Sequence, residues 1–213
     1  MKLTSRNFSE GEYIPGPLAF AVPDTENHFT LSSNLNPQLS WNDTPQGTES
    51  FVILCHDPDV PSVIDDVNQE GKVISASLPR VDFYHWLLWN IPANVQSIEE
   101  GAQSSGVTPK GKGGPEAPQG FQHGINNYTD FMAGNPDMAG TYFGYDGPCP
   151  PWNDELVHRY TFTVYAIDAK QLSVEGEPTS QNVLAALGKV SVLGKASLTG
   201  LYTLNDEAVE PMQ

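Results

Sequence analysis

The sequence predicts a mostly β protein with long loops at the ends of its strands. Residues 82–92 and 160–167 alternate between apolar and polar side chains, which is the two-residue period of a strand. The 213 residues include 19 glycines and 18 prolines, a share that predicts many turns. Only one segment carries the signals of a helix. We interpret the chain as a single domain over residues 1–213, with its core at about 18–205.

The first long strand is predicted at residues 51–55, a continuous apolar run typical of a buried strand. It leads into His-Asp-Pro-Asp-Val-Pro at 56–61, where the two prolines predict a rigid loop. The polar and acidic residues 62–79 predict a further loop, with a weak strand near 73–74. A short strand is expected at 29–31.

In the second strand, residues 82–92, the two-residue period places five side chains on one face: Phe83, His85, Leu87, Trp89 and Ile91. In residues 160–167 the same period places four side chains on one face: Tyr160, Phe162, Val164 and Ala166. His158 lies on that same face. A last strand is predicted over 196–205. Residues 1–17 contain turn-forming residues and no periodicity.

A single helix is predicted at residues 183–187, capped by Ser180 or Asn182 and ended by Gly188. Residues 99–153 are rich in Gly, Pro and Asn and show no sustained periodicity. Irregular segments of that length within a compact domain are typical of functional loops.

The charge balance restricts the partners. Ten basic and 26 acidic residues give a net charge of −16, which repels nucleic acid and anionic bilayers. An anionic ligand therefore requires a local pocket. The apolar runs are too short to span a membrane, and the first residues lack the apolar segment of a signal peptide, so we expect a cytoplasmic protein. Cys55 and Cys149 allow at most one disulfide.

The sequence contains no complete motif for binding a metal or a cofactor. The sequence lacks HExxH, CxxC and EF-hand spacings. Gly-Val-Thr-Pro-Lys-Gly-Lys-Gly at 106–113 resembles a phosphate-binding loop, but its last position is not the Ser or Thr that holds magnesium. We expect no cofactor and no metal site.

Three segments place polar or titratable groups beside aromatic residues or prolines. They are Asp-Pro-Asp-Val-Pro at 57–61, Tyr-His-Trp at 84–86, and Gly-Pro-Cys-Pro-Pro at 147–151 followed by His-Arg-Tyr at 158–160. Taken singly, each has a structural interpretation as a surface turn, a core histidine or the start of a buried strand.

Together and in this order, the segments resemble the phosphatidylethanolamine-binding protein family, also called the Raf kinase inhibitor protein family. The bacterial and archaeal branch is most similar. Ser-Asn-Leu-Asn-Pro at 33–37, Leu-Ser-Trp at 39–41 and the Gly-Lys-Ala and Gly-Leu-Tyr triplets at 194–202 support the resemblance. It covers roughly residues 18–167 and 181–205.

The resemblance implies a β-sandwich of two antiparallel sheets with an anion-binding pocket near one end. Carried over residue by residue, it implies these ligand-binding positions: Asp57, His85, Gly147, Pro148, Pro150, Pro151, His158 and Tyr160. It also implies a cis peptide bond between Val60 and Pro61.

The chain departs from the family in several places. Phe83 occupies a position where animal members have Trp. Segments 62–79 and 104–146 are longer than in compact bacterial members, so the size of the pocket does not carry over from those members. Residues 206–213 are too few for the C-terminal helix that covers the pocket in animal members.

The pocket is expected to bind phosphate, a phospholipid headgroup or another small anion, with a regulatory role. The two histidines, Tyr160 and backbone N–H groups of the Gly147 turn would donate hydrogen bonds, while Asp57 orients one imidazole. Binding should then weaken as pH rises through the histidine titration. Two alternatives are an inhibitor of proteases or kinases acting through surface loops, and a hydrolase or metal-dependent enzyme using Asp57, His85 and His158. The sequence leaves open whether the chain binds a protein partner and whether it forms a homodimer.

Overall fold

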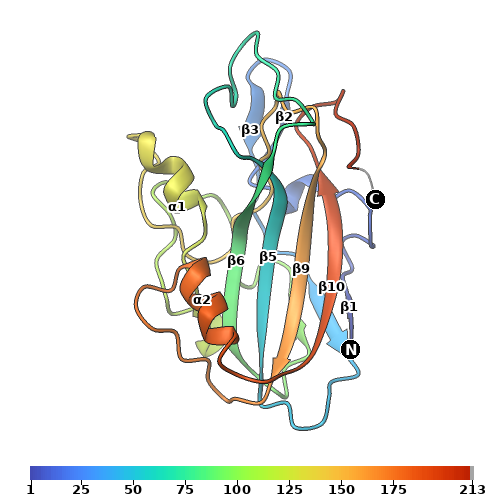
Figure 1. The fold of residues 1–213 in the computed structure, drawn as a ribbon, viewed down its shortest axis with the longest axis vertical. Coiled ribbons are helices and arrows are strands. Elements are labelled where there is room, and N and C mark those ends of the chain that lie inside the picture. The colour runs from blue at the N-terminus through green and yellow to red at the C-terminus, as the bar shows by residue number, and fades with distance from the viewer. Residues whose placement is uncertain (212–213) are drawn as a thin grey trace.

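The computed structural model describes residues 1–211, which form a mostly β fold (Figure 1). Five strands make an antiparallel sheet in the order β10 (Val192–Tyr202), β9 (His158–Ile167), β5 (Ser50–Pro61), β6 (Arg80–Pro92) and β8 (Gln122–His123). A second sheet has the order β1 (Lys2–Thr4), β4 (Leu39–Asn42) and β7 (Ser97–Ile98). Strands β2 (Ala21–Asp24) and β3 (His28–Leu31) form a separate hairpin. The predicted fold class is confirmed.

The five-stranded sheet buries both of its faces. One face forms the larger core with the three-stranded sheet, where the rings of Trp41 and Phe51 lie 5.2 Å apart. The other face is covered by helix α2 (Ser180–Leu187), whose Val183 packs against Trp89 and neighbouring apolar residues. Burial on both faces explains why residues 51–55 form a continuous apolar run.

Strand β5 is longer than predicted, because residues 56–61 continue it instead of forming a loop. Its pairing with β9 ends at His56, so residues beyond it pair only with β6. Prolines are tolerated there because residues beyond His56 have a partner strand on one side only, as at a sheet edge. The prediction of a cis bond before Pro61 is also wrong. Within residues 1–211 the cis peptide bond lies between Gly114 and Pro115.

The prediction that five side chains of β6 share one face is also wrong, because the pairing of β6 with β5 is irregular. Cys55 pairs with Trp86 and His56 pairs with Tyr84, which leaves His85 as an extra residue in a β-bulge. Beyond this bulge the alternation is reversed for Leu87 and Trp89, and a second register shift before the pair of Ile91 restores it. Leu87 and Trp89 pack under α2, whereas His85, Phe83 and Ile91 lie on the side of the larger core.

The remaining elements agree with the sequence in kind and differ at their ends. The alternation in β9 is confirmed, and β10 begins at Val192, four residues before the predicted start. Helix α2 is capped by the Thr179 side chain, and not by Ser180 or Asn182. Strand β1 lies within a segment predicted to be irregular.

Residues 99–153 are mostly irregular, as expected, but they contain a short helix α1 (Tyr128–Phe131). Short 3-10 turns complete the fold: Gly16–Leu18, Pro118–Gly120 and Met132–Gly134. Residues 203–211 contain no helix, and the last two positions of the chain lie outside the described residues. No described helix has the length and apolar character needed to cross a membrane.

Candidate functional site

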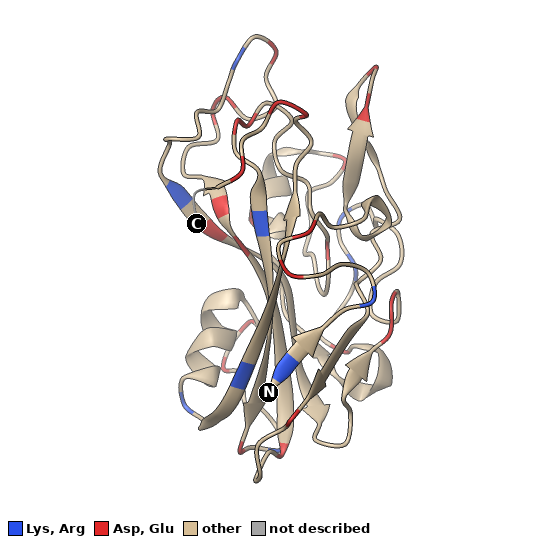
Figure 2. Cartoon of the chain, turned by 90° about the vertical axis from the view of Figure 1, so that its right-hand side faces the viewer, with Lys and Arg blue, Asp and Glu red and all other residues tan. Residues whose placement is uncertain are grey.

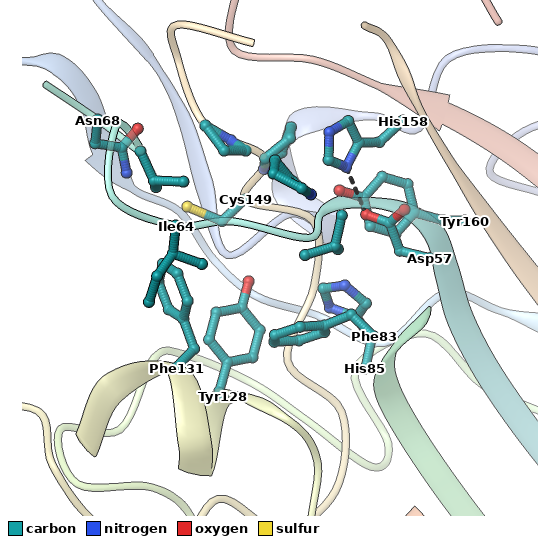
Figure 3. Close-up of a pocket in the computed structure, with 15 residues that line it drawn as sticks. Asp57, Ile64, Asn68, Phe83, His85, Tyr128, Phe131, Cys149, His158 and Tyr160 are labelled. Atoms are coloured by element: carbon teal, nitrogen blue, oxygen red, sulfur yellow. Dashed lines mark hydrogen bonds and ion pairs between the residues drawn. The ribbon is translucent and has the colours of Figure 1, made fainter. Parts of the chain in front are cut away.

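A small pocket lies where β5, β6 and β9 meet the turn at 147–151. Its volume is about 40 Å³, which holds a few water-sized groups. Figure 3 shows Asp57, His158 and Tyr160 on one side and Ile64, Asn68 and Phe131 on the other. The pocket is lined by Asp57, Val60, Pro61, Ile64, Val67, Asn68, Phe83, His85, Tyr128, Phe131, Cys149, Pro150, Pro151, His158 and Tyr160.

The polar base of the pocket is a buried chain of charges. His158 donates from Nδ1 to Asp57 Oδ2 at 2.7 Å and from Nε2 to Asp154 Oδ2 at 3.2 Å. Arg80 donates in turn to both oxygens of Asp154, at 2.5 and 3.0 Å. Asp57 Oδ1 accepts the backbone N–H of Asp59 at 2.7 Å. Both ring nitrogens of His158 are therefore occupied by carboxylates.

These contacts fix the charge of His158. Burial of the ring alone would lower its pKa, but the two carboxylates Asp57 and Asp154 raise the pKa of His158 to about 9. Despite burial, the positive charge of His158 holds the pKa of the Asp57 carboxyl below its usual value. The pair is thus an imidazolium and a carboxylate at neutral pH. Because its N–H groups are engaged, His158 does not supply the predicted donor to a ligand.

His85 has the opposite charge state. Burial lowers the pKa of its ring to about 4, so the ring is neutral at pH 7. Its Nδ1 lies 2.8 Å from the backbone oxygen of Asp146. A carbonyl oxygen only accepts hydrogen bonds, so Nδ1 carries the proton and Nε2 is an acceptor. The sequence predicts that His85 donates a hydrogen bond to an anion, but the neutral ring offers Nε2 as an acceptor instead.

Gly147 and Pro148, both predicted to contact the ligand, support the pocket from behind and do not line it. The Gly147 N–H already donates to Asn34 Oδ1 at 2.8 Å, and its carbonyl accepts the Tyr128 hydroxyl at 2.8 Å. A Cβ at Gly147 would lie 2.2 Å from the Leu18 carbonyl oxygen, so only glycine fits. The predicted donor role of the Gly147 N–H is wrong because that group is already satisfied.

Asp146 holds this turn in place. Its carboxylate accepts hydrogen bonds from Asn34 and Asn126, each at 2.8 Å, and from the Lys112 ammonium at 2.6 Å. The three donors come from distant parts of the chain, and the Asp146 carbonyl also receives His85. Asp146 therefore joins three segments directly behind the pocket, a role that its position in the sequence did not reveal.

The cations near the pocket are all paired with carboxylates. The chain as a whole carries few cations, and they are scattered over the molecule (Figure 2). The four pairs are Arg80–Asp154, His158–Asp57, Arg159–Asp59 and Lys112–Asp146. The site is therefore close to neutral, in contrast with the net charge of −16 of the whole chain.

The apolar half of the pocket was not predicted from the sequence. Tyr128 and Phe131 come from α1, while Ile64 and Val67 come from the segment between β5 and β6. Ile64 and Phe131 are 62% and 42% exposed, so they form an apolar rim. No periodic pattern marks these segments, and only their unusual length indicated a role.

The remaining predicted residues lie where expected. Pro150, Pro151 and Tyr160 line the pocket, and the Tyr160 ring packs edge-on against His85 with centroids 5.1 Å apart. Cys149 also lines it, and burial raises the pKa of its thiol to about 12, so it remains protonated. Both cysteines are free thiols. Among residues 1–211, no three His, Cys, Asp or Glu side chains converge to hold a metal ion.

Known proteins are similar to this chain in sequence and in fold. A UPF0098 protein of Methanothermobacter thermautotrophicus is 32% identical over 169 residues, covering 79% of this chain and 83% of that protein. The UPF0098 protein YbhB of Escherichia coli is 28% identical over 204 residues, covering 95% and 100%.

Two solved structures are similar. The Chlamydia trachomatis protein CT736, described as a putative phosphatidylethanolamine-binding protein homologue, matches with a TM-score of 0.61 and 27% identity, over 94% of this chain and 95% of that one. Escherichia coli YbcL matches with a TM-score of 0.66 and 24% identity, over 95% and 97%. The family description "Phosphatidylethanolamine-binding protein" matches residues 4–203. The chain belongs to the phosphatidylethanolamine-binding protein family.

Proposed function

We propose that this ligand-binding protein takes a small phosphate monoester, such as the headgroup phosphoethanolamine, into the pocket as its singly protonated form. Its role is binding, with regulation as the consequence, and the pocket does not catalyse a reaction. In this proposal His85 and Tyr160 bind the phosphate, Asp57 selects the monoanion by repulsion, and Pro150 and Pro151 form the wall.

The observation that carries this proposal is the tautomer of His85. The neutral ring donates from Nδ1 to the Asp146 carbonyl, so its Nε2 accepts a hydrogen bond. A singly protonated phosphate has one P–OH donor for this nitrogen and further oxygens that accept the Tyr160 hydroxyl. The nearby Asp57 carboxylate repels a dianion more than a monoanion, which favours the same form.

The size of the pocket supports a headgroup rather than a whole lipid. A volume of about 40 Å³ admits one compact polar group. A longer substituent would leave across the exposed rim formed by Ile64 and Phe131.

Two features favour binding over the enzymatic alternatives. The Cys149 thiol, with a pKa raised to about 12 by burial, is a poor nucleophile at neutral pH. His158 is an imidazolium at neutral pH, so it would have to lose a proton and break its hydrogen bond to Asp57 or Asp154 before it could act as a base or bind a metal. Inhibition of a protease or kinase would use surface loops, and no feature of the pocket bears on that alternative.

The proposal changes the origin of the pH dependence. His85 titrates at about 4 and His158 at about 9, so neither ring changes charge between pH 5.5 and 8. Within that window the second ionisation of the phosphate monoester, with a pKa of about 6, decides how much of the ligand is singly protonated. Affinity should therefore fall as pH rises, because the ligand loses its donor.

The test compares two ligands by NMR titration between pH 5.5 and 8. Phosphoethanolamine should bind saturably, with an affinity that falls about tenfold for each pH unit well above pH 6. Its glycerol diester, which has no P–OH group in this range, should bind at least about tenfold more weakly than phosphoethanolamine at pH 5.5, because it has no donor for Nε2 of His85. His85→Ala should abolish the shifts around the pocket, while His56→Ala, a histidine outside the pocket, should leave them intact.

Two results would contradict the proposal. One is the absence of saturable binding of phosphoethanolamine to the folded protein. The other is an affinity for phosphoethanolamine that stays constant across the window, which would exclude selection of the protonated form.

A further inference from the structure

The segment between β5 and β6, residues 62–79, forms one wall of the pocket through Ile64, Val67 and Asn68 (Figure 3). We call it the 62–79 loop. Ile74 is its one buried residue, at 3% exposure. A loop with so little core of its own must be held in place by other contacts.

Backbone hydrogen bonds join Ile74 to Asn153 and Glu155, and a second set of contacts comes from the side chain of Asn153, which is 6% exposed. Its Nδ2 donates to the carbonyls of Asp66 at 2.8 Å, Lys72 at 3.1 Å and Gln69 at 3.5 Å. Its Oδ1 accepts the backbone N–H of Asn68 at 3.0 Å. One buried amide therefore joins four backbone groups across the loop.

The neighbours of Asn153 strengthen this attachment. Asn68 Oδ1 accepts the backbone N–H of Trp152 at 3.0 Å. The side chain of each asparagine is therefore hydrogen-bonded to the backbone of the segment that contains the other. The Trp152 ring stacks on His28 with centroids 3.8 Å apart, and His28 Nε2 lies 2.6 Å from a carboxylate oxygen of Glu70 in the loop. Residues 152 and 153 directly follow the Pro150–Pro151 wall, so they fix the loop relative to the opposite side of the pocket.

We propose that Asn153 is a specificity-determining residue that sets the size limit of the pocket by fixing the 62–79 loop. The inference rests on the proposed function, since it concerns which phosphate monoesters enter the same pocket. Asn153 lies outside the pocket lining and acts through the loop. With the loop fixed, the wall formed by Ile64 and Val67 admits a compact group and excludes a ring attached directly to the phosphate.

The test uses Asn153→Ala and Asn153→Asp. The alanine variant removes all four hydrogen bonds. The aspartate variant keeps the acceptor for Asn68 but loses the donors and places a carboxylate beside three carbonyls. Asn182→Ala is the matched control, because Asn182 donates to the Glu177 carbonyl near α2, away from the pocket. Thermal unfolding establishes that each variant is folded.

Two quantities are measured on each protein. The first is amide hydrogen exchange in residues 66–74, which should become at least about tenfold faster in both Asn153 variants. The second is the ratio of affinities for phenyl phosphate and phosphoethanolamine. This ratio should rise about tenfold in favour of phenyl phosphate, the scale at which one apolar wall discriminates. Asn182→Ala should change neither quantity.

The outcomes separate the two proposals. If the wild-type protein binds neither probe, the proposed function fails and the size limit fails with it. If the wild-type protein binds phosphoethanolamine but both Asn153 variants keep its affinity ratio, the pocket is real and Asn153 does not set its size limit. Unchanged hydrogen exchange in folded variants would also overturn the inference, because the loop would then be held by other contacts.

Discussion

At the scale of single residues, His158 shows how a buried charge is maintained. A charged imidazole in a protein interior is unfavourable unless it is paired and hydrogen-bonded. His158 satisfies both conditions, because one ring nitrogen donates to Asp57 and the other to Asp154. Removing either carboxylate should therefore change the proton affinity of the ring as well as its position.

We predict that Asp154→Asn lowers the pKa of His158, from about 9 in the wild-type protein, by at least about one pH unit. The variant removes one of the two negative charges and also leaves the Arg80 cation unpaired beside the ring. NMR titration of the imidazole resonances measures the change directly.

Asp59→Asn serves as the control for this prediction. Asp59 is a buried carboxylate close to the pocket, but it pairs with Arg159 and makes no hydrogen bond to His158. If the two variants shift the His158 titration equally, general electrostatics and not the contact with Asp154 governs the ring.

At the scale of elements, the sequence predicted regular pairing well and irregular pairing poorly. The alternation in β9 is confirmed because that strand pairs in continuous register with β5. The alternation in β6 fails at His85, where a bulge moves Leu87 and Trp89 to the opposite face, and a second register shift returns Ile91 to the first face. A bulge depends on the pairing of two strands, so the pattern of one strand does not reveal it. Bulges beside binding sites change the direction in which a side chain points. Here the extra residue is His85, which lines the pocket.

The same division applies to the candidate site. Its polar half, including Asp57, His85, His158 and Tyr160, was found because short motifs carry it. Its apolar half comes from α1 and the 62–79 loop, which follow no period. The charge states were mispredicted as well, because the pKa of a histidine depends on burial and on partners such as Asp154, which only tertiary structure brings together.

Helix α2 provides a prediction at this scale. Thr179 Oγ1 accepts the backbone N–H of Asn182, so Thr179 and not Ser180 is the cap. Thr179→Ala should lower the free energy of unfolding by about 1 kcal/mol. Ser180→Ala, already inside the helix, should change it by less than about 0.5 kcal/mol. Urea denaturation measures both, and equal losses would contradict the assignment of the cap.

At the scale of the whole molecule, three buried histidines make stability depend on pH in opposite directions. Burial lowers the pKa of His85 and His123 to about 4, below the unfolded value of 6.5. Between these values the folded protein binds fewer protons than the unfolded chain, so stability rises with pH. The pKa of His158 is raised to about 9, so its contribution is fully present below pH 6.5 and is lost as pH rises through 9.

We therefore predict that the free energy of unfolding is highest near pH 6.5 and falls on both sides. The alkaline loss is the contribution of His158 and amounts to about 3 kcal/mol, because a tenfold difference in proton affinity between the folded and unfolded states corresponds to about 1.4 kcal/mol. Urea denaturation at intervals from pH 5 to 9.5 measures the curve. Asp154→Asn should flatten the alkaline limb, because it brings the folded pKa of His158 closer to 6.5, while Asp59→Asn should retain it. A wild-type curve that is flat from pH 6.5 to 9 would mean that His158 is not charged in the folded protein, and the charge pairing at the base of the pocket would have to be reassigned.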